Sequence, residues 1–116
     1  MIQTPFDIEQ TDENGRYRLA VSGELDLATA PELGAAIETL CKAGALCIVI
    51  DLQAVKFIDS SGLREIMVAK DECASHRAEF LVVPPKHPAP RKLFEVAGVA
   101  DLIPWEQADS DEPLPA

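Results

Sequence analysis

The chain has 116 residues, enough for one domain with a single hydrophobic core. Hydrophobic residues make up 47% and charged residues 26%, which excludes extensive disorder, and the 5% aromatic content predicts an aliphatic core. The 20 acidic and 10 basic residues give a formal charge of -10, which argues against nucleic acid as a partner and suits a protein partner with a basic face.

The beginning of the chain predicts a β-hairpin. We expect a short strand at Pro5–Gln10, a turn at Thr11–Gly15 that ends in Asn-Gly, and a half-buried strand at Arg16–Ser22. In the second strand Tyr17, Leu19 and Val21 alternate with more polar residues, which is the period of a strand with one buried face. The Gly-Glu-Leu-Asp sequence at 23–26 interrupts this pattern.

The next segment predicts a helix followed by a buried strand. Thr29 and Glu32 have the spacing of a capping box, apolar residues then recur at helical spacing, and Gly44 is a natural helix stop. The apolar run Leu46–Leu52 is continuous rather than alternating, which is typical of a strand covered on both faces. A short loop is expected to lead from this strand to Asp59.

The second half of the chain predicts two more helices and two short strands. A helix after Asp59 would bury Leu63, Ile66, Met67, Cys73 and Ala74 and expose Arg64, Val68, Asp71, Glu72 and Ser75. A strand at Phe80–Val83 precedes a helix at Pro88–Ala97, which would bury Leu93, Phe94 and Ala97 and be capped by Gly98. A last strand is expected at Leu102–Trp105.

These elements predict one α/β domain. Their order is β-β-α-β-α-β-α-β, which implies a mixed central β-sheet with helices packed on one side or both. We place the domain at residues 1–107 and expect residues 108–116 to be an acidic, disordered tail.

Cysteine usage and hydropathy predict a cytoplasmic protein. Cys41, Cys47 and Cys73 are an odd number without Cys-x-x-Cys spacing and lie among apolar neighbours, so we interpret them as small core residues in a reducing compartment. The N-terminus lacks the features of a signal peptide, and no apolar stretch approaches the roughly 20 residues that span a bilayer. We therefore expect no membrane insertion.

The Asp-Ser-Ser-Gly sequence at 59–62 has two interpretations. Asp and Ser are preferred N-caps, and Gly62 would let the turn close tightly, so the segment can be a helix cap alone. Alternatively, Ser60 is exposed and can be phosphorylated. The positive end of a helix tolerates the added charge, whereas a partner docked over the turn would have to bury it, so phosphorylation would end binding while the domain stays folded. Either way, we expect Asp59 to cap the helix.

Enzymatic interpretations fit the sequence poorly. A hydrolase elbow needs glycine two positions either side of its serine, but Ile58 and Gly62 flank Ser60. Neither His76 nor His87 has a visible orienting acid, no cluster has metal-ligand spacing, and the opening hairpin argues against a receiver domain. We predict a protein that is not an enzyme and needs no cofactor or metal.

Four segments together resemble a known family. They are Gly-Glu-Leu-Asp at 23–26, Ile-Val-Ile-Asp-Leu at 48–52, Phe-Ile-Asp-Ser-Ser-Gly-Leu at 57–63 and the sequence from Arg91 to Gly98. In order and spacing they resemble the bacterial anti-sigma factor antagonists of the STAS domain family. The resemblance runs from about Phe6 to Gln107, and the Asp-Ser-Ser-Gly motif is its most specific part.

The resemblance implies a partner switch. The unphosphorylated protein would bind an anti-sigma factor with serine kinase activity and release the sigma factor. Phosphorylation on Ser60 would end binding, and a metal-dependent serine/threonine phosphatase would reset the switch. The protein would be a monomer when free. The alternative is a STAS module that acts without a phospho-switch, as a scaffold of a stress-signalling complex or an accessory subunit of a membrane transport system.

The same resemblance implies the residues of the partner surface. Asp59, Ser61 and Gly62 would shape the phosphorylation site, and Gly23, Glu24 and Asp26 would lie in an adjoining loop on the same face. The spacing of the second helix extends this surface, as a hypothesis, to Arg64 and Val68.

Overall fold

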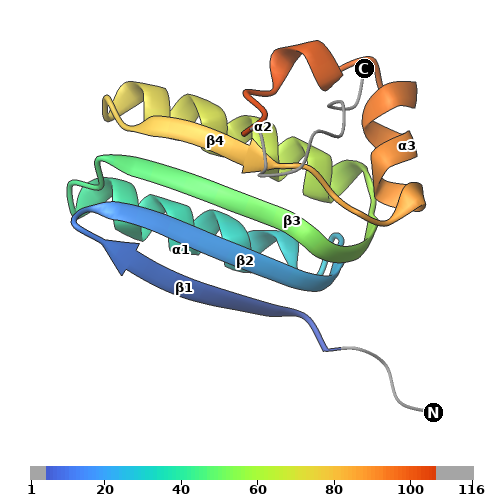
Figure 1. The fold of residues 1–116 in the computed structure, drawn as a ribbon, viewed down its shortest axis with the longest axis horizontal. Helices are drawn as coiled ribbons and strands as arrows, with labels where there is room; N and C mark the ends of the chain where they lie inside the picture. Colours follow the sequence, from blue (N-terminus) through green and yellow to red (C-terminus); the bar gives the residue numbers. More distant parts are fainter. Residues whose placement is uncertain (1–4, 107–116) are drawn as a thin grey trace.

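In the part of the chain that the structure describes, four strands form one mixed sheet in the order β1-β2-β3-β4 (Figure 1). The computed structural model describes residues 5–106. β1 (Asp7–Glu13) pairs antiparallel with β2 (Arg16–Leu25), and β3 (Cys47–Ile58) pairs in parallel with both β2 and β4 (Glu79–Val83). The predicted opening hairpin and mixed α/β sheet are confirmed.

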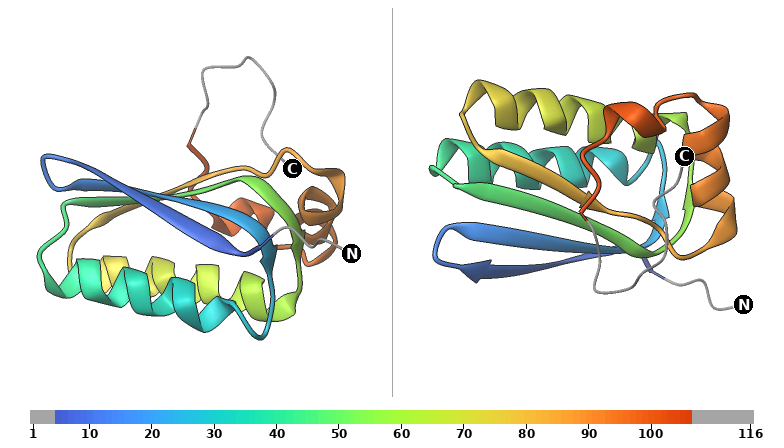
Figure 2. Two further views of the ribbon diagram at one scale, coloured as in Figure 1. Left: turned by 90° about the horizontal axis from the view of Figure 1, so that it is seen from below. Right: turned by 45° about the horizontal axis from the view of Figure 1, so that its top comes forward.

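Two helices lie side by side on one face of this sheet (Figure 2). They are α1 (Ala30–Lys42) and α2 (Ser60–Ser75). α3 (Pro88–Val96) contacts β3 near one end of the sheet, and the 3₁₀ turn η1 (Ala100–Leu102) follows it (Figure 1). None of the helices within residues 5–106 is long and apolar enough to cross a membrane.

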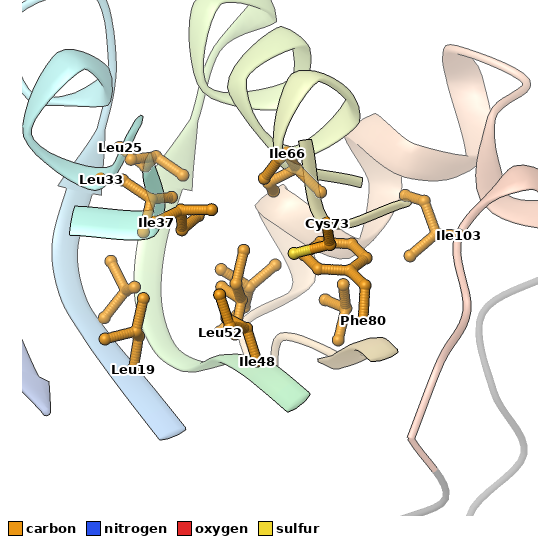
Figure 3. Close-up of a cluster of buried hydrophobic side chains, with 14 of the residues drawn as sticks. Leu19, Leu25, Leu33, Ile37, Ile48, Leu52, Ile66, Cys73, Phe80 and Ile103 are labelled. Carbon is orange, nitrogen blue, oxygen red and sulfur yellow. The ribbon is translucent and has the colours of Figure 1, made fainter. Parts of the chain in front are cut away.

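The core fills the space between the sheet and its helices. It is built almost entirely from aliphatic side chains, as predicted, and no polar or charged side chain in the described range is buried. Figure 3 shows part of it, with side chains from β2, β3, α1 and α2 pointing toward one another. The aromatic ring of Phe94 is fully buried and meets Trp105 edge-on, with ring centroids 5.2 Å apart.

The first half of β3 is buried on both faces, but helices cover only one of them. Ile48, Ile50 and Leu52 face α1 and α2. On the opposite face Cys47 and Val49 form a smaller cluster with residues of β4. The continuous apolar run therefore correctly predicted that the first half of β3 has buried residues on both faces of the sheet.

β1 and β2 are longer than predicted. β1 runs to Glu13, so the turn is formed by Asn14 and Gly15 alone, both with positive φ (56° and 85°). β2 continues beyond Ser22, because Gly23, at φ +87°, accommodates an irregularity in register after which pairing with β3 resumes. The prediction that residues 23–26 interrupt the strand was therefore wrong for residues 23–25, which belong to β2.

β3 is also longer than predicted. It begins at Cys47, and Leu46 is 65% exposed. The expected loop after Leu52 does not exist, because the strand runs on to Ile58. In this second half Val55 and Ile58 are buried while the residues between them are exposed, so the strand has one buried face and pairs with the extension of β2.

The helices correct three further predictions. The capping box fails, because the side chain of Thr29 makes no cap hydrogen bond and instead donates to the carbonyl oxygen of Glu24 at 2.8 Å. Ala74 and Ala97, predicted to be buried, are exposed, and Ala69 takes the place of Ala74 in the core. The helical spacing therefore predicted which side of α2 and of α3 faces the core, but not that this side is exposed at the C-terminal end of each helix.

The predicted last strand is absent from the described residues. Residues 100–102 form η1, and Trp105 then makes a single parallel bridge to Val82. The prediction of a disordered tail at 108–116 falls outside the described residues.

Candidate functional site

The turn between β3 and α2 is held by Asp59. Its backbone is extended, and its Oδ1 accepts hydrogen bonds from the backbone N–H groups of Ser61 (2.8 Å) and Gly62 (3.1 Å). Two of the unpaired N–H groups at the start of the helix are thereby satisfied. The N–H of Asp59 donates to the carbonyl oxygen of Leu25 at 3.2 Å, which ties the turn to the end of β2. The predicted cap is confirmed.

Gly62 lets α2 approach β2 closely. A Cβ atom added to it would lie 2.5 Å from the carbonyl oxygen of Leu25, 2.9 Å from the Leu25 Cγ and 3.1 Å from a methyl carbon of Ile58. These neighbours are backbone and buried side chain, so they have little freedom to move. The glycine of the motif is therefore required by close packing between elements.

Ser60 presents its side chain at the positive end of α2. It is the first residue of the helix and is exposed, whereas Ser61 is half-buried. The first turn of α2 contains no acidic residue, and the exposed Arg64 follows one turn later on the same side. Helix N-termini and guanidinium groups both favour anions, so this position is suited to a phosphate.

The loop between β2 and α1 is shaped by Asp26. Its Oδ1 accepts hydrogen bonds from the N–H groups of Ala28 (3.0 Å) and Thr29 (3.2 Å), while its own N–H donates to the Thr29 hydroxyl at 2.9 Å. These bonds hold the loop beside the serine turn, since Leu25 is paired with Ile58. Asp26 thus supports the site, and the exposed Glu24 faces outward next to it.

An apolar groove lies on one side of the serine turn. We call it the Leu27 groove; it has a volume of about 360 Å³ and is lined by Leu27, Ala30, Pro31, Ser61, Arg64, Glu65 and Val68. Leu27 is 75% exposed and Val68 is 46% exposed, although both are apolar. The groove runs between the first turns of α1 and α2.

A second apolar groove lies on the other side of the turn. This Phe57 groove, also of about 360 Å³, is lined by Phe57, Ile58, Ala89, Lys92, Leu93 and Val96. Phe57 is 45% exposed and Val96 is 73% exposed. Ile58 lines this groove and Ser61 lines the Leu27 groove, so the two grooves are contacted by residues only three positions apart in the chain.

The site lacks the geometry of a serine hydrolase. The prediction that His76 has no acid beside it was wrong, because its Nδ1 lies 3.1 Å from the Glu72 carboxylate; the same nitrogen lies 3.3 Å from the Ser75 hydroxyl. A catalytic triad uses the two different ring nitrogens for its acid and its serine, whereas here both contacts involve the same one. His76 also follows Ser60 by the length of α2, about 24 Å at 1.5 Å per residue. Within residues 5–106 no group of three or more His, Cys, Asp and Glu residues could hold a metal ion.

Comparison with known proteins identifies the family. A model of the STAS domain matches residues 6–112. The chain belongs to the STAS domain family. The anti-sigma-B factor antagonist of Staphylococcus aureus (strain NCTC 8325 / PS 47) is 30% identical over 98 residues, which cover 84% of this STAS domain chain and 90% of that protein. The anti-sigma-F factor antagonist RsfB of Mycobacterium tuberculosis (strain CDC 1551 / Oshkosh) is 40% identical over 72 residues, covering 62% and 58% of the two chains.

Solved structures have the same STAS fold. An anti-sigma factor antagonist from Mycobacterium paratuberculosis superimposes with a TM-score of 0.79 at 29% identity, over 95% of this chain and 94% of that one. The unphosphorylated form of the anti-sigma factor antagonist SpoIIAA superimposes with a TM-score of 0.72 at 23% identity, over 90% of each chain.

The STAS fold brings the sequence-predicted site residues to one end of the molecule. Glu24, Ser60, Arg64 and Val68 are exposed there. Gly23 and Gly62 are buried and shape the backbone: a Cβ on Gly23 would lie 2.8 Å from the Pro5 carbonyl oxygen. Sequence reasoning missed the two grooves and their exposed residues Leu27 and Phe57. Period-two alternation would place Phe57 on the same face as the buried Val55, so the pattern did not predict its exposure; a register irregularity lies between these two residues.

Proposed function

We propose that this STAS domain is an anti-sigma factor antagonist whose binding surface is the serine turn with its two flanking grooves. The observation that carries the proposal is the exposed Ser60, which lies in the chain between Ile58 of the Phe57 groove and Ser61 of the Leu27 groove. The names of the relatives in Staphylococcus and Mycobacterium support the same role. The partner is an anti-sigma factor, and its binding to this surface would free the sigma factor.

Phosphorylation of Ser60 is the switch in this proposal. The anti-sigma factor would act as a serine kinase and transfer the terminal phosphoryl group of ATP to the Ser60 hydroxyl. The fold tolerates the product, because the N-terminus of α2 stabilises negative charge and Arg64 lies four residues further on. The backbone hydrogen bonds of Asp59 do not involve the Ser60 side chain, so the cap survives.

The same phosphate would prevent docking. Unmodified Ser60 is a small neutral group between two apolar grooves, which a partner can cover at little cost. A phosphate adds roughly 1.5 to 2 negative charges beside the Asp59 carboxylate. Arg64 carries a single positive charge, so a docked partner would still bury unpaired negative charge, which is very unfavourable. Binding is therefore lost while the domain stays folded, and a metal-dependent serine/threonine phosphatase would restore it.

The chain acts as substrate in this scheme and not as enzyme. Oδ1 of Asp59 accepts two backbone N–H groups as a helix cap, and His76 is at the far end of α2. The general base and the nucleotide site would both be supplied by the kinase.

Capture of the partner in the presence and absence of ATP tests this proposal. Tagged wild-type protein, Ser60→Ala and Ser75→Ala are used as baits in extracts of the source cells, and the phosphorylated residue is mapped by mass spectrometry. Ser75 is an exposed serine at the other end of α2 and serves as the matched control. We expect an anti-sigma factor that leaves wild type and Ser75→Ala upon ATP addition, with one phosphate on Ser60, and that stays on Ser60→Ala. Partners that ignore ATP, with Ser60 unmodified, would contradict the switch and favour a scaffold role.

A further inference from the structure

Two of the three cysteines meet inside the helix layer. Cys41 lies in the last turn of α1 and Cys73 in the last turn of α2, and their Sγ atoms are 3.8 Å apart. Both are buried, with 2% and 0% of their surface exposed. Figure 3 shows Cys73 pointing into the core toward Phe80. The two residues are 32 positions apart in the chain, so the contact is made by the packing of α1 on α2.

The third cysteine is placed differently. Cys47 begins β3 and belongs to the smaller cluster with Val49 and Val83, on the face of the sheet away from α1 and α2. It is as deeply buried as Cys73. Burial is therefore common to all three cysteines, whereas a sulfur–sulfur contact across the two helices is particular to Cys41 and Cys73.

Both paired thiols are held in their protonated form while the helices are closed. Burial raises the pKa of Cys73 to about 12, with the neighbouring Cys41 contributing, and burial also raises the pKa of Cys41. Since the thiolate is the reactive form, the closed pair is protected from oxidation. Both residues, however, lie within three positions of a helix end. Opening of the last turns, which is the least costly local unfolding of a helix, would expose them.

We propose that Cys41 and Cys73 form a reversible disulfide that ties α1 to α2 under oxidising conditions. The oxidant is a low-molecular-weight disulfide such as oxidised glutathione. One cysteine thiolate attacks it and releases one glutathione thiolate, which takes up a proton. The second cysteine then attacks the mixed disulfide and releases the other glutathione. Two protein thiols lose two electrons and two protons, and one glutathione disulfide becomes two glutathione thiols.

The sulfur–sulfur contact favours this bond. A disulfide needs its sulfurs at about 2.05 Å, so the two Sγ atoms, 3.8 Å apart in the reduced pair, must move closer when the bond forms. The cross-link would join the ends of α1 and α2 that lie opposite the serine turn. Cys73 follows Ser60 by 13 residues, about 20 Å along the helix. Oxidation should therefore raise stability and leave the surface around Ser60 unchanged.

Equilibration in glutathione redox buffers tests the inference without any partner. The full chain is incubated at a series of reduced-to-oxidised ratios, with and without a sub-denaturing concentration of urea to speed opening of the helix ends. The protein is then quenched with acid and unfolded in denaturant, so that the remaining buried thiols can be alkylated, and it is mapped by mass spectrometry. We expect loss of two hydrogen atoms, one alkylated cysteine (Cys47), a Cys41–Cys73 linked peptide and a melting temperature higher by several degrees that dithiothreitol reverses.

Variants distinguish this bond from other oxidation products. Cys47→Ala should form the same bond and show the same shift in melting temperature, while Cys41→Ala and Cys73→Ala should show neither. Three alkylated cysteines under every buffer and urea condition, a stable glutathione adduct, or a link that includes Cys47 would overturn the proposal. None of these readouts depends on sigma-factor binding, so the function proposed above and this disulfide stand or fall separately.

Discussion

Substituting Gly62 by alanine tests whether close packing against β2 shapes the serine turn. The added Cβ would stand 2.5 Å from the Leu25 carbonyl oxygen and 2.9 Å from the Leu25 Cγ. Overpacking of this kind costs about 1–3 kcal/mol, and because the neighbours here are rigid we expect a cost of about 3 kcal/mol. Alanine also favours a helix over glycine by about 1 kcal/mol. We expect a net loss of about 2 kcal/mol in the free energy of unfolding.

Gly34→Ala is the matched control for this substitution. It makes the same chemical change inside α1, but the atoms that the new Cβ would meet are the end of the flexible Glu65 side chain, which can turn away. The free energy of unfolding should change by less than about 1 kcal/mol, because the helix preference of alanine offsets the displaced side chain. Urea unfolding followed by circular dichroism measures both variants. A Gly62→Ala protein as stable as Gly34→Ala would refute the packing argument.

Three further predictions concern the cap, the Leu27 groove and the buried thiols. Asp59→Ala should lower the free energy of unfolding by about 1–2 kcal/mol in urea titrations, since two N–H groups of α2 lose their acceptor, and an unchanged midpoint would speak against the cap. Leu27→Ala should weaken anti-sigma factor binding in calorimetry by about tenfold with an unchanged melting temperature, whereas Leu102→Ala, an exposed leucine on η1, should leave affinity intact. The pKa of Cys73 is raised from its ordinary value of 9.0 to about 12, so the folded state keeps a proton that the unfolded state releases. Stability should thus fall as pH rises from 9 toward 12, and Cys73→Ala should flatten the fall in melting temperature; an identical slope would contradict the burial of this thiol.

The serine turn was predictable because its chemistry is local. Asp59 caps the residues that follow it directly, and the helical spacing of Leu63 and Ile66 defines the buried face of α2 whatever the rest of the chain does. The capping box predicted at Thr29 does not form. In such a box the Glu32 side chain would accept a hydrogen bond from the N–H of Thr29, but here that N–H donates to Oδ1 of Asp26, three residues earlier. A capping pattern does not reveal such competition between neighbouring side chains.

The grooves were not predictable because they depend on distant elements. Leu27 and Val68 line one groove only because the start of α1 lies beside α2, and Phe57 and Val96 line another only because α3 packs against the end of β3. The length of β3 was missed for the same reason. Its second half contains the strand-favouring residues Val55, Phe57 and Ile58, but the buried Val55 and Ile58 are three positions apart and so do not show the period-two pattern of a strand. This half pairs with the extension of β2, which includes Gly23 at positive φ.

The most direct test of the switch is the affinity of one anti-sigma factor for the unmodified and the Ser60-phosphorylated protein, measured by calorimetry beside the melting temperature of each. Ser75→Asp, which adds a charge at the far end of α2, controls for net charge. We expect phosphorylation on Ser60 to weaken binding by at least about tenfold, equivalent to about 1.4 kcal/mol, while the melting temperature changes little and Ser75→Asp binds normally. Equal affinity of the two forms would contradict the proposed switch and leave Ser60 as part of a helix N-terminus alone.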